Sequence, residues 1–138
     1  MKISEDLKVL YNKVLEAYRN AYAPYSKFNV GAAVLLKNGD IIIGANIENA
    51  SYGLANCAER SALFSVYSKG YRKEDISKMM IIGKTKTPIS PCGACRQVIS
   101  ELMEQNCDVV LTNLEQDMKI IKVKDLLPYS FSEENLNE

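Results

Sequence analysis

Three cysteines and one glutamate form the most reactive pattern in the sequence. Cys57-Ala58-Glu59 is followed further along the chain by Pro91-Cys92-Gly93-Ala94-Cys95. Three thiolates can bind one zinc ion and leave the fourth position of its tetrahedron open for water, as a catalytic site requires. Glu59, two residues after one of these cysteines, can then accept and return protons. A lone CxxC pair is often incidental or redox-active, but a third cysteine and a nearby glutamate favour a catalytic metal site.

The composition narrows the chemistry further. The chain has no histidine, so any metal ligand or proton carrier must come from other residue types. The fourth cysteine, Cys107, has no partner motif and is expected to be a small core residue near a strand. Lys and Arg number 17, and Asp and Glu number 17, which gives a net charge of zero. Without a basic run, the sequence predicts no nucleic-acid partner. Zinc is the expected metal, although tetrahedral thiolate sites also accept iron.

Length and hydropathy set the expected organisation and location. A chain of 138 residues with 47% hydrophobic residues predicts a single domain over residues 1–138 with a proper core. No apolar run approaches the ~20 residues that cross a bilayer, so no membrane partner is expected. The polar start, Met1 to Asp6, lacks a signal-peptide core. We therefore expect a cytoplasmic protein with reduced cysteines.

The order of predicted elements indicates an α/β fold. Apolar residues at helical spacing predict a first helix that is capped by Ser4 and ends before Pro24. Asn38-Gly39 predicts a hairpin turn. We expect further helices over residues 57–69 and 91–105, and strands over residues 29–36, 41–43, 79–83, 109–111 and 119–123. This order predicts a five-stranded mixed sheet with helices on its faces.

The cysteines are predicted to lie at the starts of two helices. Asn56 is the expected N-cap before Cys57, and Ser90 is the expected N-cap before Pro91 and Cys92. A helix N-terminus carries a partial positive charge that favours thiolate over thiol. Three thiolates and Zn²⁺ leave one net negative charge, which a cation bonded to the sulfurs would offset. Arg60 is the first candidate for this role, and Arg96 is the second.

With these residues in place, the chain resembles the small homotetrameric cytidine deaminases, members of the cytidine and deoxycytidylate deaminase superfamily. The resemblance extends from about Tyr22 to Phe131. It is carried by three segments: Ala23-Pro24-Tyr25-Ser26-Lys27-Phe28-Asn29-Val30-Gly31-Ala32-Ala33, Asn46-Ile47-Glu48-Asn49-Ala50-Ser51-Tyr52 continuing to Cys57-Ala58-Glu59-Arg60, and Pro91-Cys92-Gly93-Ala94-Cys95-Arg96-Gln97. It implies a three-layer α/β/α cytidine-deaminase-like fold, one Zn²⁺ per subunit, and deamination of cytidine and 2′-deoxycytidine in pyrimidine salvage.

The resemblance also implies roles for residues outside the cysteine motifs. Phe28 would pack against the pyrimidine, and Asn46 and Glu48 would bind the ribose hydroxyls. Ala58 would offer its backbone to the base, and Phe131 of a neighbouring subunit would help to close the site in a homotetramer. From the residues alone, Phe28 is as readily a core residue, Asn46 and Glu48 are ordinary loop residues, and Phe131 is a simple tail anchor.

Three other functions remain open at this point. Another aminopyrimidine nucleoside, such as blasticidin S, would need the same zinc motif. Editing of polynucleotides would need a basic groove, which the neutral composition does not favour. A zinc-stabilised binding module without activity would usually have four protein ligands, and the sequence offers three.

Overall fold

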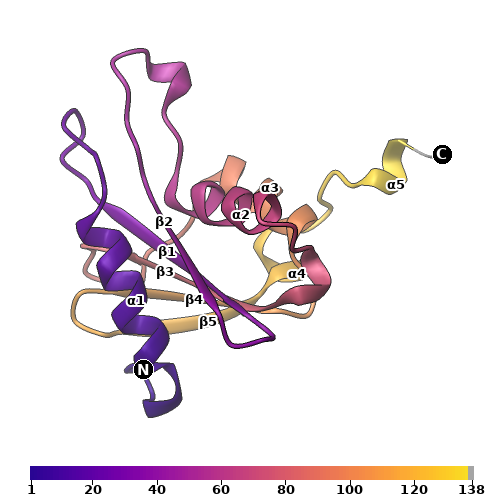
Figure 1. The fold of residues 1–138 in the computed structure, drawn as a ribbon, viewed down its shortest axis with the longest axis horizontal. Helices are drawn as coiled ribbons and strands as arrows, with labels where there is room; N and C mark the ends of the chain where they lie inside the picture. The colour runs from indigo at the N-terminus through magenta and orange to yellow at the C-terminus, as the bar shows by residue number, and fades with distance from the viewer. Residues whose placement is uncertain (137–138) are drawn as a thin grey trace.

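The computed structural model describes residues 1–136 and contains one five-stranded mixed sheet (Figure 1). Its strands are β1 (Val30–Leu36), β2 (Ile41–Ala45), β3 (Ile76–Gly83), β4 (Asp108–Asn113) and β5 (Met118–Lys122). The strand order is β2-β1-β3-β4-β5; β3 and β4 pair in parallel, and the other neighbours are antiparallel. The predicted mixed sheet of five strands is confirmed.

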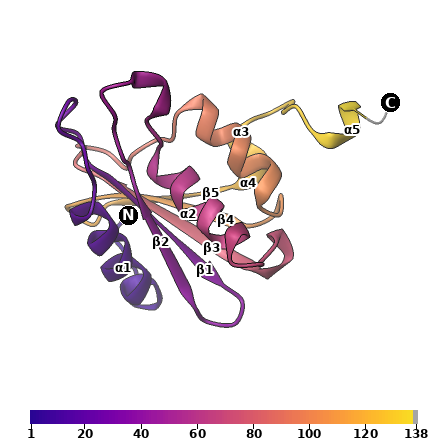
Figure 2. The ribbon, with the colours of Figure 1, turned by 45° about the horizontal axis from the view of Figure 1, so that its top comes forward.

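Helices cover both faces of this sheet, which confirms the three-layer arrangement. Helix α1 (Lys8–Arg19) lies on one face, and α2 (Ala58–Ser68), α3 (Gly93–Leu102) and α4 (Val123–Leu126) lie on the other (Figure 2). Short 3₁₀ helices are η1 (Glu5–Leu7), η2 (Tyr52–Leu54) and η3 (Lys73–Asp75). Helix α5 (Glu133–Leu136) projects away from the sheet (Figure 1). None of the helices within residues 1–136 has the length and apolar character of a membrane span.

The central strand β3 contributes side chains to the core on both faces of the sheet. Met79 and Ile81 pack with the α2 and α3 side, whereas Met80 and Ile82 pack with α1. All four side chains are fully buried. Because consecutive side chains of a strand point to opposite faces, a strand covered on both sides is apolar throughout. This explains why the sequence of β3 shows no polar alternation at its centre.

Gly44 allows helix α2 to lie directly against the sheet. A Cβ atom at this position would be 2.4 Å from the backbone nitrogen of Ala62 and 2.8 Å from the carbonyl oxygen of Ala58. Any side chain on β2 at this point would therefore push the helix away. Because Gly44 has no side chain, the first turn of α2 packs closely on β2, and this contact sets the position of Cys57 and Glu59 relative to the sheet.

The predicted helix caps at Asn56 and Ser90 are wrong. Cys57 and Cys92 are themselves the N-cap residues of α2 and α3. Asn56 instead donates from Nδ2 to Ser61 Oγ at 3.2 Å, and Ser90 Oγ accepts from Arg96 at 2.6 Å. Helix α3 accordingly runs over Gly93–Leu102 rather than residues 91–105.

The cap predicted at Ser4 is also not formed as expected. Ser4 precedes the 3₁₀ helix η1 and makes no side-chain capping bond, and α1 begins only at Lys8. Competing local hydrogen bonds explain such errors, since serine and asparagine side chains bond readily to neighbours other than a helix end.

Candidate active site

The three cysteines of the two motifs meet where α2 and α3 begin. The sulfur atoms of Cys57, Cys92 and Cys95 all lie within 4.8 Å of one another. Three sulfur ligands at the usual Zn–S distance of about 2.3 Å stand about 3.8 Å apart around a tetrahedral ion. The cluster therefore fits zinc with three protein ligands, and two helix N-termini add positive potential beside it. Cys107 lies elsewhere, with its thiol directed at the carbonyl of Ile76 at 3.5 Å.

The cluster favours one thiolate even before a metal binds. A hydrogen bond from the Cys95 thiol, followed by one from Arg60, lowers the pKa of Cys57 to about 5. The pKa of Cys95 is raised, because its proton is held by Cys57 and its side chain is buried. A thiolate is the form that binds zinc, so Cys57 is ready to act as a ligand at neutral pH.

Arg60 is the cation at this thiolate. Its Nη2 atom donates to Cys57 Sγ at 3.4 Å, while its buried Nε has no hydrogen-bond partner within residues 1–136. Arg96, the second candidate, is used differently, because it donates to the carbonyls of Pro91 and Leu126, both at 2.9 Å. Arg60 therefore offsets thiolate charge, and Arg96 fixes the segment that leads to Cys92.

Glu59 lies in the first turn of α2 and is almost completely enclosed, with 4% of its surface exposed. Burial raises the pKa of its carboxyl group, and the nearby Cys57 thiolate raises it further. A carboxyl group with a raised pKa holds a proton more readily near neutral pH. Ala58, immediately before it, is fully buried and begins the helix.

Phe28 lies over the carboxyl end of β3. Its Cζ atom is 3.4 Å from the point where a Cβ on Gly83 would lie, and Ile89 Cδ1 is 2.5 Å from that point. The ring therefore lies beside the segment that leads to Cys92. Its exposed fraction is 40%, so Phe28 is not a core residue and presents an open apolar surface.

Asn46 holds the same loop by its side-chain amide. Its Oδ1 accepts the N–H of Val30 at 2.9 Å, and its Nδ2 donates to the carbonyl of Phe28 at 2.9 Å. Its backbone carbonyl accepts the N–H of Tyr22 at 3.0 Å. Asn46 thus joins the end of β2 to the loop before β1.

Glu48 holds the other end of the Phe28 loop. Its Oε1 accepts the N–H groups of Tyr25 at 3.0 Å and Ser26 at 3.1 Å, and its Oε2 accepts the Ser26 hydroxyl. The hydroxyl of Ser26 is the main cause of the lowered pKa of Glu48. Ser26 is not among the predicted site residues, although it lies inside a segment that carries the family resemblance.

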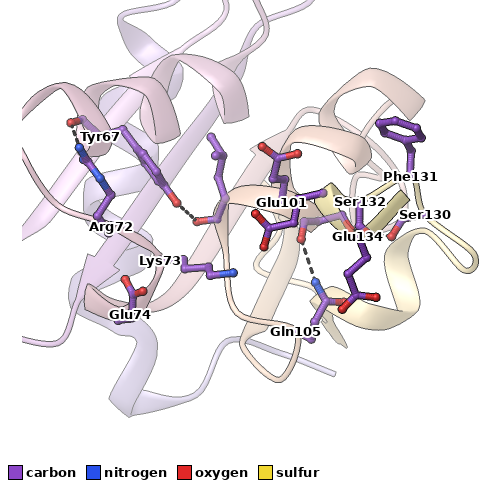
Figure 3. Close-up of a pocket in the computed structure, with 13 residues that line it drawn as sticks. Tyr67, Arg72, Lys73, Glu74, Glu101, Gln105, Ser130, Phe131, Ser132 and Glu134 are labelled. Carbon is purple, nitrogen blue, oxygen red and sulfur yellow. Dashed lines mark hydrogen bonds between the residues drawn. The ribbon is translucent and has the colours of Figure 1, made fainter. Parts of the chain in front are cut away.

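Phe131 lies apart from the cysteines. It lines a pocket of about 520 Å³ between α3 and the C-terminal segment, with Tyr67 and Arg72 at the opposite side (Figure 3). Its carbonyl accepts a hydrogen bond from Gln97 at 2.9 Å, and 57% of its surface is exposed. The residues that line this pocket within residues 1–136 include neither a cysteine nor Glu59.

Known proteins match this chain over most of its length. The family model described as "Cytidine and deoxycytidylate deaminase zinc-binding region" matches residues 4–111. A protein named cytidine deaminase from Halalkalibacterium halodurans is 50% identical, over 96% of this chain and 99% of the relative. One from Sporosarcina psychrophila is 46% identical, over 96% of each chain.

Solved structures agree with this similarity. The crystal structure of cytidine deaminase from Burkholderia pseudomallei has a TM-score of 0.88 and 46% sequence identity, and the match covers 94% of this chain and all of that one. The structure of cytidine deaminase from Mycobacterium tuberculosis gives 0.75 and 32%, over 93% of this chain and 98% of the other. The chain therefore belongs to the cytidine and deoxycytidylate deaminase family, which binds zinc.

Proposed function

We propose that this chain catalyses the hydrolytic deamination of cytidine and 2′-deoxycytidine to uridine and 2′-deoxyuridine, with release of ammonia. One observation carries the proposal: Glu59, a buried glutamate with a raised pKa, lies two residues after Cys57 of a three-cysteine cluster that fits zinc. Family membership narrows the substrate, because relatives that are similar almost end to end are named cytidine deaminase.

The proposed reaction assigns a separate task to each residue of the centre. Zinc held by Cys57, Cys92 and Cys95 would act as a Lewis acid and lower the pKa of water. Glu59 would take up the water proton on its carboxylate and deliver protons to the ring nitrogen and to the leaving amine. Arg60 would keep the thiolate charge from weakening the metal as a Lewis acid.

The loop residues would position the nucleoside. Phe28 would pack against the pyrimidine, and the backbone of Ala58 would meet its polar edge. Asn46 and Glu48 would bind the ribose hydroxyls. The side-chain amide of Asn46 donates one of its two N–H groups to the loop and accepts one hydrogen bond from it at Oδ1. The second N–H and the second lone pair of Oδ1 therefore remain available to bind the substrate.

We also propose a homotetramer in which Phe131 closes the site of a neighbouring subunit. The exposed ring of Phe131, and the projection of the tail away from the sheet (Figure 1), support this. Tyr52 and Leu54 of η2, exposed by 92% and 72%, supply apolar surface for such contacts in the segment between Glu48 and Cys57. In the cell, we place this reaction in cytoplasmic pyrimidine salvage.

The test is a substrate panel. Zinc-loaded protein is incubated with cytidine, 2′-deoxycytidine, CMP and blasticidin S, and uracil products and ammonia are quantified. We expect equal amounts of uridine and ammonia from cytidine, a corresponding result from 2′-deoxycytidine, and little product from CMP or blasticidin S. Faster turnover of blasticidin S than of cytidine would contradict the proposal and show that blasticidin S is the preferred substrate.

A further inference from the structure

We propose that Ser26 is a positioning residue that couples the ribose-binding carboxylate of Glu48 to the base-binding ring of Phe28. The inference rests on the proposed function, which assigns those two residues to the nucleoside. It adds a residue that contacts neither substrate nor metal in that scheme and acts through its two neighbours.

Ser26 makes three hydrogen bonds in the loop. Its hydroxyl donates to Glu48 Oε2, and its backbone N–H donates to Glu48 Oε1 at 3.1 Å. The same hydroxyl oxygen accepts the backbone N–H of Phe28 at 3.1 Å. The carboxylate therefore holds Ser26 with both oxygens, and Ser26 holds the backbone that sets the Phe28 ring.

The backbone of this loop needs such restraint. Lys27, between Ser26 and Phe28, has a φ of 61°, in the left-handed region that residues with a Cβ disfavour. Its N–H donates to the carbonyl of Ala23 at 3.0 Å, which closes a tight turn. Without the Ser26 hydroxyl, one of the bonds that hold this turn against relaxation is lost.

The contacts of the Phe28 ring show why a small shift of its backbone affects nucleoside binding. The ring lies against Gly83 at the end of β3, where Ile89 also makes close contact. A turn of the Phe28 backbone would move the ring off this surface, while the Glu48 carboxylate would lose the donor that orients its Oε2. Both changes alter ground-state binding of a nucleoside and leave the cysteine cluster in place.

Replacing Ser26 with alanine should therefore raise KM for cytidine and spare kcat. A hydrogen bond to a charged group corresponds to roughly tenfold in binding, and exposure of Ser26 reduces this. We expect Ser26→Ala to raise KM by about fivefold, with kcat within about twofold of wild type and zinc content unchanged. Ser26→Thr keeps the hydroxyl and should restore KM to within about twofold.

The matched control is Ser51→Ala. Ser51 is an exposed serine before η2, close in sequence to Glu48, and its side chain does not cap that helix. The control should leave KM and kcat unchanged. Thermal unfolding of all three variants, with zinc bound, should lie within about 2 °C of wild type because both serines are at the surface.

A double-mutant cycle tests whether the effect of Ser26→Ala on kcat/KM depends on Glu48. In the Glu48→Ala background, Ser26→Ala should lower kcat/KM by less than about twofold. The bond to the carboxylate is already lost there, so the Ser26 hydroxyl is no longer held in the position from which it accepts the Phe28 N–H. The same fivefold loss in both backgrounds would overturn the inference, as would a Ser26→Ala variant that matches Ser51→Ala. Wild-type protein that holds zinc but does not deaminate cytidine would overturn the proposed function, and with it this inference.

Discussion

The packing of α2 on the sheet predicts that Gly44→Ala disables the site although Gly44 itself has no assigned role in binding or catalysis. A methyl group at this position would lie 2.4 Å from the nitrogen of Ala62 and 2.8 Å from the oxygen of Ala58. Both atoms belong to the backbone, so no side chain can rotate out of the way. Restoring ordinary contact at about 3.5 Å requires α2 to move by about 1 Å relative to β2.

Two consequences follow from this shift. Overpacking of this kind costs about 1–3 kcal/mol of stability, and each kcal/mol lowers Tm by roughly 3–5 °C at this chain length. The first turn of α2 carries Cys57 and Glu59, which move with the helix, whereas Cys92 and Cys95 belong to α3. A misplacement of about 1 Å costs on the order of 10²-fold in rate.

The assay compares kcat/KM, bound zinc and Tm for Gly44→Ala against wild type. Gly53→Ala is the matched control, because a Cβ there meets no atom within 4 Å. We expect the control to be unchanged and Gly44→Ala to lose at least about tenfold in kcat/KM. Wild-type activity and Tm in Gly44→Ala would refute the account of how α2 is positioned.

Three further predictions concern the metal and the assembly. Cys92→Ala should reduce bound zinc to below about one tenth per chain and lower Tm, since the metal links two helices; full zinc and activity would show that the ligand set is wrong. Arg60→Gln should raise the pKa of Cys57, because it removes the hydrogen bond from Arg60 that helps to lower that pKa, and protons should therefore displace zinc at a higher pH on acid titration; an unchanged midpoint of zinc release would show that Arg60 does not have this role. Phe131→Ala should raise KM for cytidine by about tenfold with zinc retained, and mixing it with Glu59→Gln protein after verified subunit exchange should restore wild-type-like sites; a fully active monomer would contradict the shared site.

The chemistry of the site could be predicted from the sequence because ligand type and spacing determine it. Cys57, Cys92 and Cys95 are recognisable as zinc ligands before any fold is known, and α2 and α3 bring them together as expected. The apolar runs likewise predicted all five strands. The start of β3 lies earlier than predicted, because Ser77 and Lys78 are two consecutive polar residues where the strand is only partly covered.

The contacts between loops could not be predicted from local patterns. The bond between Ser26 and Glu48 joins residues 22 positions apart, and nothing in either segment specifies the other as its partner. Asn56 is of a residue type that often caps helices and it precedes α2, but its side chain is hydrogen-bonded to Ser61 instead. The close approach at Gly44 depends on the register of β2 under α2, which only the tertiary packing defines.

The most direct test of the central claim is zinc content and cytidine turnover in Glu59→Gln. The amide keeps the shape of the buried side chain but cannot carry protons, and the three cysteines are untouched. We expect about one zinc per chain, as in wild type, and a turnover lower by at least ~10²-fold, the usual contribution of a general acid–base. Near-normal release of ammonia from cytidine by the zinc-loaded variant would contradict the account.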